Sequence, residues 1–356
     1  MQIKAEDLKD VVDVLRRVPV NASIKTSQFV RLRAVKEGLE LCTQCDAMAR
    51  FVVPVEGKPD FTTFHVERAA FFPFVGVASG MLDVETVKGK LTMKQGRRKA
   101  AFVDVDPGKY QTFTVPDKAV KLTEHQLHLV KAARRYALDD VGEPRFNCVM
   151  LDNGSIMGAS HVAFFHAKTD NFGAHVPLSL AVCDLLDKWQ PALHATATAT
   201  AAVFTNGALY HPLSSTCLEE FPGPLLFQRA REIKKSPVQF AAKAGRLLDA
   251  LRTVQTITSG SVVEDMVLSI RPSTDKLTLG VAGQAVSVTE TVKAAQVAAT
   301  AKEELLLVSV LPFVQFAAEE KADAYIEFRY LPKSGYLLTF EDSCILAARR
   351  DTAKAS

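Results

Sequence analysis

The sequence predicts an α+β fold with antiparallel sheets, built as three similar domains, because one order of patterns occurs three times. Amphipathic helix patterns near residues 6–17, 123–138 and 238–254 begin about 115 to 120 residues apart. Each is followed by strand-like runs and then by a second helix pattern. These second patterns lie near 65–79, 177–189 and 307–321. The predicted domains are residues 1–115, 116–235 and 236–356, each with two helices packed on antiparallel sheets.

Short runs of β-branched and aromatic residues between turn residues predict the strands. They lie at 28–35, 39–55 (broken near Cys45), 146–151, 156–165, 201–210, 266–270, 277–281 and 325–331, with an alternating Ala/Thr strand at 192–202. Asn153-Gly154 predicts a tight hairpin turn, because this pair accepts positive φ at low cost. A doubly wound fold would alternate single strands with single helices, and this chain does not.

Composition limits the class of protein. The chain has 356 residues, of which 48% are hydrophobic and 23% charged, enough for a full core in two or three domains. We find no apolar run of about eighteen residues that would span a membrane and no signal-peptide layout at the amino terminus. We therefore expect a cytoplasmic protein without a membrane partner. The net charge of +3 is modest, so any contact with DNA must come from the placement of charges.

The cysteines and acidic residues do not predict a metal site. Cys42 and Cys45 form a single CxxC, and the other four cysteines are isolated, so the second half of a zinc site is missing. We expect ordinary buried thiols. Asp104 and Asp106 precede Pro107-Gly108, where turn capping is the expected role. The sequence also lacks phosphate-binding glycine loops, and we expect neither a metal nor another cofactor.

An enzyme is the competing class of function. Ser160-His161 with Asp170 suggests a hydrolase, but neighbouring residues on one strand point to opposite faces of the sheet. No nucleophile-elbow motif is present either. We therefore expect no catalysis and keep the hydrolase as the lesser alternative.

The helix that opens the middle domain has a basic side. Its apolar side is formed by Leu122, Leu129, Val130, Ala133, Tyr136 and Ala137. Its other side carries Lys121, His125, His128, Lys131 and Arg135. This side is either an ordinary solvated face or a surface that faces phosphate. The third domain's helix also places Lys243 and Arg246 away from its apolar side, which favours the phosphate-facing alternative.

Several segments resemble the bacterial DNA polymerase III beta subunit, the sliding clamp, over nearly the whole chain. They are 39–50 (LELCTQCDAMAR), 113–116 (FTVP), 145–151 (RFNCVML), 158–163 (GASHVA) and 220–222 (EFP). The family carries Thr-Asp-Gly-His-Arg-Leu at the fourth segment, of which only His161 is kept. It carries Arg-Phe-Pro-Asp-Tyr at the fifth, of which Phe221-Pro222 is kept. The chain resembles a divergent member, and a phage or plasmid origin is one alternative.

The resemblance implies a DNA-clamp fold that closes as a head-to-tail homodimeric ring around duplex DNA, with helices inside and sheets outside. Such a ring binds DNA without sequence preference, is placed by a clamp loader and tethers the replicative DNA polymerase. The implied DNA-binding residues are Lys25, Lys121, His125, His128, Lys131, Arg135, Arg145, Lys243 and Arg246. Phe102 and Ile257 are candidate dimer contacts, or alternatively core residues within their domains.

The resemblance also implies a pocket for partner peptides between the middle and third domains. Its residues would be Phe146, Gly158, His161, Ala163, Pro222, Leu226, Phe227, Ile345, Leu346 and Ala347. Val162 and Leu226 stand where the family has arginines, and the chain end lacks the family's Met-Pro-Met-Arg. A clamp-like DNA-binding scaffold that does not slide is the second alternative, and linearising a circular template would separate it from a true clamp.

Overall fold

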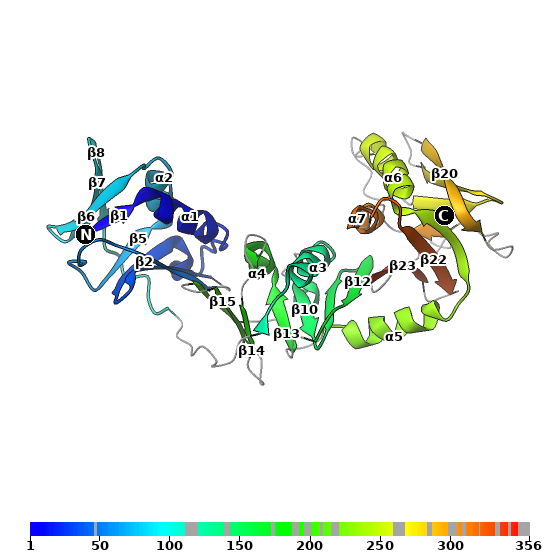
Figure 1. Ribbon diagram of the computed structural model, residues 1–356, viewed down its shortest axis with the longest axis horizontal. Helices are drawn as coiled ribbons and strands as arrows, with labels where there is room; N and C mark the ends of the chain where they lie inside the picture. Colours follow the sequence, from blue (N-terminus) through cyan, green and yellow to red (C-terminus); the bar gives the residue numbers. More distant parts are fainter. Residues whose placement is uncertain are drawn as a thin grey trace. The chain divides into compact units, whose positions relative to one another are not determined.

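A computed structural model of the chain describes residues 1–45, 48–110, 120–138, 143–171, 175–186, 192–195, 201–206, 209–214, 221–258, 268–282, 287–297, 305–307, 311–319, 321–331, 335–340 and 343–347. The chain forms two compact units (Figure 1). The first comprises Met1–Leu127 and Phe172–Leu218, and the second comprises His128–Asn171 and Glu219–Ser356. The predicted middle domain is therefore divided between the two units, while the division into three domains stays a prediction.

The first unit contains two antiparallel sheets. One has the order β1-β6-β7-β8, with β1 (Gln2–Lys4), β6 (Met81–Val87), β7 (Lys90–Gln95) and β8 (Arg98–Val103). The other has the order β5-β2-β3-β4-β16-β15-β14-β9. Its strands are β2 (Phe29–Val35), β3 (Gly38–Gln44), β4 (Met48–Val53), β5 (Thr63–Glu67), β9 (Val120–Lys121), β14 (Ala192–Ala195), β15 (Ala201–Asn206) and β16 (Leu209–Ser214). The unit also has α1 (Ala5–Leu15), η1 (Lys25–Gln28), α2 (Arg68–Gly76), β13 (His175–Ser179) and α4 (Leu180–Leu185).

A buried arginine joins the two helices of the first unit. Helix α1 buries Leu8, Val12 and Leu15 along one side, as its helical spacing predicts. Arg68, at the start of α2, donates hydrogen bonds to the carbonyl oxygens of Leu15 (2.9 Å), Val18 (2.8 Å) and Ser27 (2.8 Å). Because carbonyls at the end of a helix lack intrahelical donors, this guanidinium satisfies them and fixes the chain after α1.

In the second unit, the strands continue as one hydrogen-bonded order, β10-β11-β12-β24-β23-β22-β17-β20-β19-β18-β21. They are β10 (Cys148–Asp152), β11 (Ser155–Ala159), β12 (Ala163–Lys168), β17 (Val238–Lys243), β18 (Leu268–Pro272), β19 (Lys276–Ala282), β20 (Ser287–Val297), β21 (Leu305–Leu307), β22 (Tyr325–Leu331), β23 (Gly335–Phe340) and β24 (Ser343–Ala347). Its helices are η2 (Pro144–Phe146), α5 (Gly223–Lys234), α6 (Ala244–Thr258) and α7 (Leu311–Glu319), and α3 (Glu124–Arg134) spans the sequence boundary between the units.

The predicted alternation of helices and strands is confirmed, and it is more regular than the sequence suggested. Helices α1, α2, α4 and α6 each begin at the residue after a strand ends, and α3 begins three residues after the end of β9. The Asn153-Gly154 turn joins β10 to β11, and both residues have positive φ (41° and 96°), as predicted. Asp106 accepts a hydrogen bond from the Gly108 amide at 2.9 Å, which confirms its turn-capping role.

Several predicted elements were wrong in their extent, including the helix patterns at 65–79 and 177–189, whose first residues lie in β5 and β13. Residues 238–243 form strand β17 and not the start of a helix, because this segment pairs with β20 on one side and β22 on the other. Non-local pairing thus overrides a helical pattern. The predicted strand 156–165 is two strands, β11 and β12, and 201–210 falls on β15 and β16. Ser160-His161 therefore lies in the turn between two strands and not on one strand.

The described cysteines are free thiols, and Cys42, Cys45, Cys148 and Cys183 are buried, as expected. Burial raises the pKa of Cys42 to about 12, so this thiol stays protonated and unreactive at neutral pH. Cys217 lies outside the described residues. Within the described part of the chain, none of the helices has the length and apolar character needed to cross a bilayer.

Replacing Gly158 with alanine tests how closely α3 packs on the sheet. A Cβ at Gly158 on β11 would lie 2.0 Å from the Ala133 carbonyl oxygen on α3, so the helix or the strand would have to move. We expect Gly158→Ala to lower the free energy of unfolding by about 2 kcal/mol, seen as a lower urea midpoint by circular dichroism. The control is Gly76→Ala, where the added Cβ meets only the flexible end of the Arg16 side chain at 3.2 Å. Equal midpoints for both variants would contradict the close packing.

Candidate functional site

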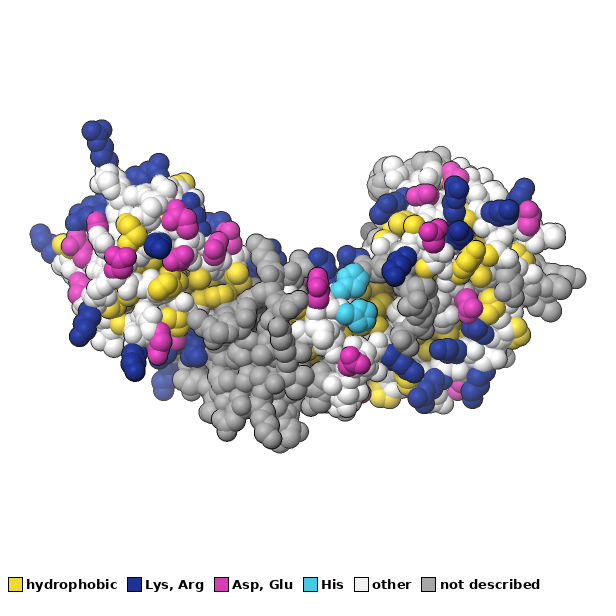
Figure 2. Space-filling view, viewed as in Figure 1, with side chains coloured by type: hydrophobic (Ala, Val, Ile, Leu, Met, Phe, Trp, Pro, Cys, Tyr) yellow, Lys and Arg dark blue, Asp and Glu magenta, His cyan; other side chains and the backbone are white. Residues whose placement is uncertain are grey.

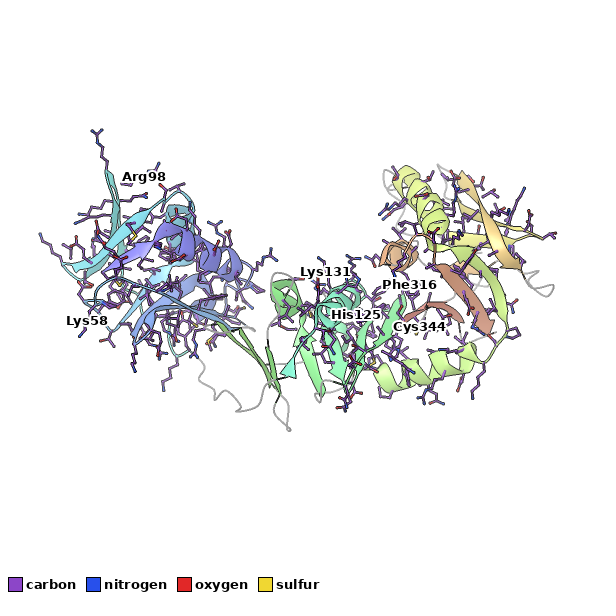
Figure 3. The ribbon with its side chains drawn as sticks, viewed as in Figure 1. Lys58, Arg98, His125, Lys131, Phe316 and Cys344 are labelled. Carbon is purple, nitrogen blue, oxygen red and sulfur yellow. The ribbon has the colours of Figure 1, made fainter. Side chains whose placement is uncertain are left out.

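Helix α3 has the two sides that the sequence predicts. Leu129, Val130 and Ala133 of the helix are buried, and so are Leu122 and Tyr136, which flank it. His125, His128, Lys131 and Arg135 are exposed on the other side, with Arg135 one residue beyond the helix end. Figure 2 shows two histidine side chains together at the surface of this segment, and Figure 3 labels His125 and Lys131. Stacking of Tyr136 on Phe165 of β12 (5.2 Å between ring centroids) holds the end of α3 against the sheet.

The other predicted DNA-facing cations occupy several elements. Lys25 is exposed in η1, and Arg246 is exposed in α6. Lys121 was predicted on the basic side of the helix, but it lies in β9, because its backbone pairs with Ala192. Its side chain is outside what the structure describes. Lys25 and Lys121 belong to the first unit and Arg246 to the second.

Two of these cations have local acidic and aromatic partners. Arg145 pairs with Glu143 (Nε to Oε2, 3.0 Å) and lies over the ring of Phe146. Lys243 is 3.5 Å from a carboxylate oxygen of Asp323 and lies over Tyr325. Both pairs are at the surface, where such ion pairs are weak. Local partners nevertheless reduce the charge that either side chain offers to phosphate.

The predicted peptide pocket falls on one region of the second unit, formed by α5, η2, β12 and β24. Strands β12 and β24 pair in antiparallel register, with Ala163 opposite Ala347 and Phe165 opposite Ile345. Phe146 meets His161 edge-on, with 5.1 Å between ring centroids. Phe146 and Leu346 belong to the core cluster that Leu226 and Phe221 cover. Most of the predicted residues are therefore neighbours in space.

These residues divide into a buried floor and an accessible rim. The buried residues are Phe146, Ala163, Ile345, Leu346 and Ala347. His161 is exposed, and Pro222, Leu226 and Phe227 are half-buried, so they form the rim. Gly158 differs from the prediction, because the space above its Cα is filled by the backbone of Ala133. Gly158 positions α3 and does not line the pocket.

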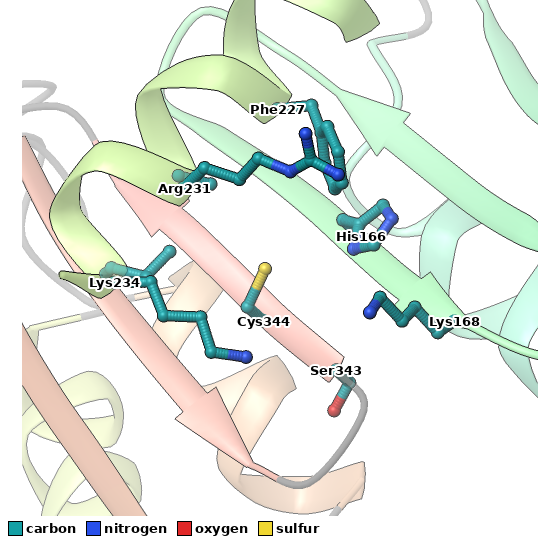
Figure 4. A pocket seen from close by; sticks show the side chains of 9 residues that line it. His166, Lys168, Phe227, Arg231, Lys234, Ser343 and Cys344 are labelled. Atoms are coloured by element: carbon teal, nitrogen blue, oxygen red, sulfur yellow. The ribbon is translucent and has the colours of Figure 1, made fainter.

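The sequence prediction missed helix α5 and the cavity beside it. The cavity encloses about 160 Å³ and is lined by His166, Lys168, Phe227, Ala230, Arg231, Lys234, Leu337, Ser343 and Cys344 (Figure 4). Two sequence signals were available for α5. Pro224 stands in its first turn, and Arg231 and Lys234 stand in its last turn, as helix termini favour.

The two titratable groups at the floor of this cavity are held neutral. Burial, with Lys168, Lys234 and Arg231 nearby, lowers the pKa of His166 to about 4. One ring nitrogen of His166 lies 3.2 Å from the Ser155 hydroxyl oxygen. Burial raises the pKa of the Cys344 thiol to about 12, despite the opposing effect of Lys234 and Lys168. At neutral pH the charge of the cavity therefore comes from its three cations.

The two candidate dimer contacts have different environments. Phe102 on β8 is 7% exposed and packs edge-on against Phe71 and Phe74, which places its side chain in the core of the first unit. Its neighbour Val103 is 57% exposed. Ile257 lies in the last turn of α6, and its side chain is outside what the structure describes.

Ser160 and His161, two of the three residues behind the hydrolase alternative, make structural contacts, and so does Asp104, for which turn capping was expected. The Ser160 hydroxyl lies 3.4 Å from both the backbone carbonyl and the amide of Ala163, across the turn from β11 to β12. The ring of His161 faces Phe146. Asp104 accepts hydrogen bonds from the backbone and ring of His65. These contacts build a turn and fix a loop, and they do not align a nucleophile with a base.

Comparisons with known proteins place the fold. No family model matches the chain, and no curated protein matches it. Solved structures do match over almost the full length. The DNA polymerase sliding clamp of Bacillus subtilis is 12% identical, with a TM-score of 0.82 and coverage of 99% of this chain and 98% of that one. A putative DNA polymerase III beta subunit from Eubacterium rectale is 9% identical, with a TM-score of 0.82 and coverage of 98% and 99%.

A third match is the Helicobacter pylori beta clamp bound to a DNA ligase peptide, which is 12% identical, with a TM-score of 0.79 and coverage of 98% and 99%. At such low identity, the likeness establishes the predicted fold alone. The chain therefore has the α+β fold of the DNA polymerase III beta subunits, at a sequence distance that marks it as divergent.

Proposed function

We propose that the chain is a DNA sliding clamp, which closes as a homodimeric ring around duplex DNA and tethers the replicative polymerase to its template. The observation that carries the proposal is the likeness to sliding clamps across 98–99% of the chain. The exposed side of α3 also supports the proposal, because its histidines and cations suit a surface near phosphate. The protein would raise processivity by attachment and would perform no chemistry.

Modest positive charge suits this role. Each phosphate that a protein neutralises tightens binding and steepens its dependence on salt, so a dense basic groove would resist movement along DNA. A ring holds DNA by topology and needs only weak contacts. The net charge of +3 and the local pairing of Arg145 and Lys243 are consistent with such a lining.

Two unlike sheet edges offer a route to ring closure. Among the described strands, β8 ends the order of its sheet in the first unit, and β21 ends the order in the second unit. Unpaired edges are prone to unwanted pairing and are usually covered. A head-to-tail contact between the β8 edge of one subunit and the β21 edge of another would cover both, and would close a ring when the rotation permits. Exposed Val103 on β8 would then be covered.

The rim and floor formed by α5, η2, β12 and β24 are the proposed site for partner peptides of the polymerase and the clamp loader. The Helicobacter pylori clamp that shares this fold was solved with a DNA ligase peptide. An apolar floor with His161 at its exposed rim suits a peptide with aliphatic and aromatic anchors. Because β24 pairs with both β12 and β23, point substitutions test the site better than removal of the strand.

Reversing charge on α3 should weaken retention on DNA. We expect Lys131→Glu with Arg135→Glu to shorten the lifetime of the protein on nicked circular DNA about tenfold. The affinity should also depend less steeply on salt concentration, by the equivalent of about two phosphate contacts. Lys88→Glu with Lys90→Glu, at the exposed β6–β7 turn, makes the same change of charge elsewhere and is the control. Normal retention of the α3 variant would show that this side of the helix does not face DNA.

Linearising the circular DNA tests topology in the same assay. A clamp slides off free ends, so we expect the wild-type protein to be lost from linear DNA and kept when both ends are blocked. Equal retention on open linear and circular DNA would support the scaffold alternative and contradict the sliding clamp.

Two adjacent leucines of α5 give a matched test of the peptide site. Leu226 covers the core cluster below the rim, whereas Leu225 is 56% exposed. We expect Leu226→Ala to weaken the binding of a dye-labelled peptide with leucine and phenylalanine anchors about tenfold, because a buried apolar contact is lost. Leu225→Ala should change it less than twofold. Fluorescence polarisation measures both, and equal effects would move the peptide site away from this face of α5.

A further inference from the structure

The cavity beside α5 combines cationic walls with an apolar floor. Lys168 extends from β12 and Lys234 from α5, and Ser343 and Cys344 of β24 lie between them (Figure 4). Phe227, Ala230 and Leu337 supply the apolar surface. Arg231 is held over the ring of Phe227, with 4.4 Å from its guanidinium carbon to the ring centroid. The cations are thus fixed by two elements of the fold around a space of about 160 Å³.

The positive charge of this cavity is not balanced from within the described part of the chain. Among the described residues, no ion pair involves Lys168, Arg231 or Lys234, and the nearby carboxylate of Glu232 accepts a hydrogen bond from Gln228 instead. His166 and Cys344 stay neutral at the floor. Three cations around a small, partly apolar space favour an anionic group as the ligand.

We propose that this cavity binds the carboxylate of an acidic residue in a partner peptide whose apolar anchors occupy the neighbouring rim and floor of α5, η2, β12 and β24. This inference deepens the proposed function and rests on it. Phe227 belongs to both sites, so a peptide that leaves the rim along α5 reaches the cavity directly. Lys168 and Lys234 would bind the carboxylate, and Phe227 and Leu337 would contact the methylene groups that carry it.

Helix geometry sets the position of the acidic residue. Phe227, Arg231 and Lys234 are spaced i, i+4 and i+7, so they lie on one side of α5. Seven residues of helix rise about 10 Å, and an extended peptide covers about 3.3 Å per residue. The acidic residue should therefore lie about three positions from the anchor that contacts Phe227.

A carboxylate fits this cavity better than a DNA phosphate. An acidic side chain enters alone on a flexible apolar stem, which the floor of Phe227, Ala230 and Leu337 would cover. The phosphates of a duplex are fixed along a rigid backbone and would leave that apolar surface in contact with water.

Matched peptides test the proposal on the full chain. The probes are dye-labelled decapeptides with a Leu-Phe anchor, carrying Glu or Gln three positions before or three positions after it. For one of the two placements, we expect the Glu peptide to bind about tenfold more tightly than its Gln twin, as charge-assisted hydrogen bonds predict. In Lys168→Gln with Lys234→Gln, this ratio should fall to about one, because the cationic walls are lost.

The control variant is Arg229→Gln with Lys235→Gln, which removes two exposed cations of the same helix region that do not line the cavity. It should keep the preference for Glu. A ratio near one in the wild-type protein for both placements would overturn the proposal. So would a preference that survives the cavity variant, or one that the control loses equally. A short DNA duplex tests whether the cavity binds phosphate instead. If it displaced the Glu peptide from the wild-type protein but not from Lys168→Gln with Lys234→Gln, the cavity would be assigned to phosphate.

A second probe separates this inference from the proposed function. If neither peptide of a pair binds, the peptide site fails, and 3-phenylpropanoate is then used by ligand-observed nuclear magnetic resonance. Binding that disappears in Lys168→Gln with Lys234→Gln would keep the carboxylate site while the proposed function loses its peptide groove. Absence of binding by both probes would overturn the carboxylate site as well.

Discussion

Main-chain pairing between strands that are far apart in the sequence is the constraint on which this structure depends. Strand β24, close to the end of the chain, pairs with β12 through five residue pairs, from Ala163–Ala347 to Ala167–Ser343. Strand β16 similarly meets β4 in the first unit. These pairings satisfy backbone groups that would otherwise form exposed edges. They also bring α5 and the last strand to the same face, and so create the candidate peptide site and the cavity beside it.

Local sequence patterns correctly predicted the elements whose conformation depends mainly on neighbouring residues. The Asn153-Gly154 turn and the buried side of α3 formed where the residues predicted. Strand β17 was taken for the start of a helix, because its pairing with β20 and β22 leaves no local pattern. The order of helices and strands, and hence the fold class, could be predicted because it repeats along the chain.

The candidate site was predictable only in part. The resemblance to sliding clamps indicated the segments that meet around His161 and Leu346, and the structure brings them together. It could not indicate that Ile345 is fully buried or that Gly158 supports α3, since burial depends on three-dimensional packing. The cavity needed the juxtaposition of Lys168 and Lys234, which are on different elements.

Ring closure is the central claim of the proposed function, because a sliding clamp holds DNA by enclosing it. Negative-stain electron microscopy of the purified full-length protein measures it most directly, through class averages of particles seen face-on. We predict rings of six similar lobes around a hole wide enough for duplex DNA. Compact particles without a central hole would contradict the sliding clamp.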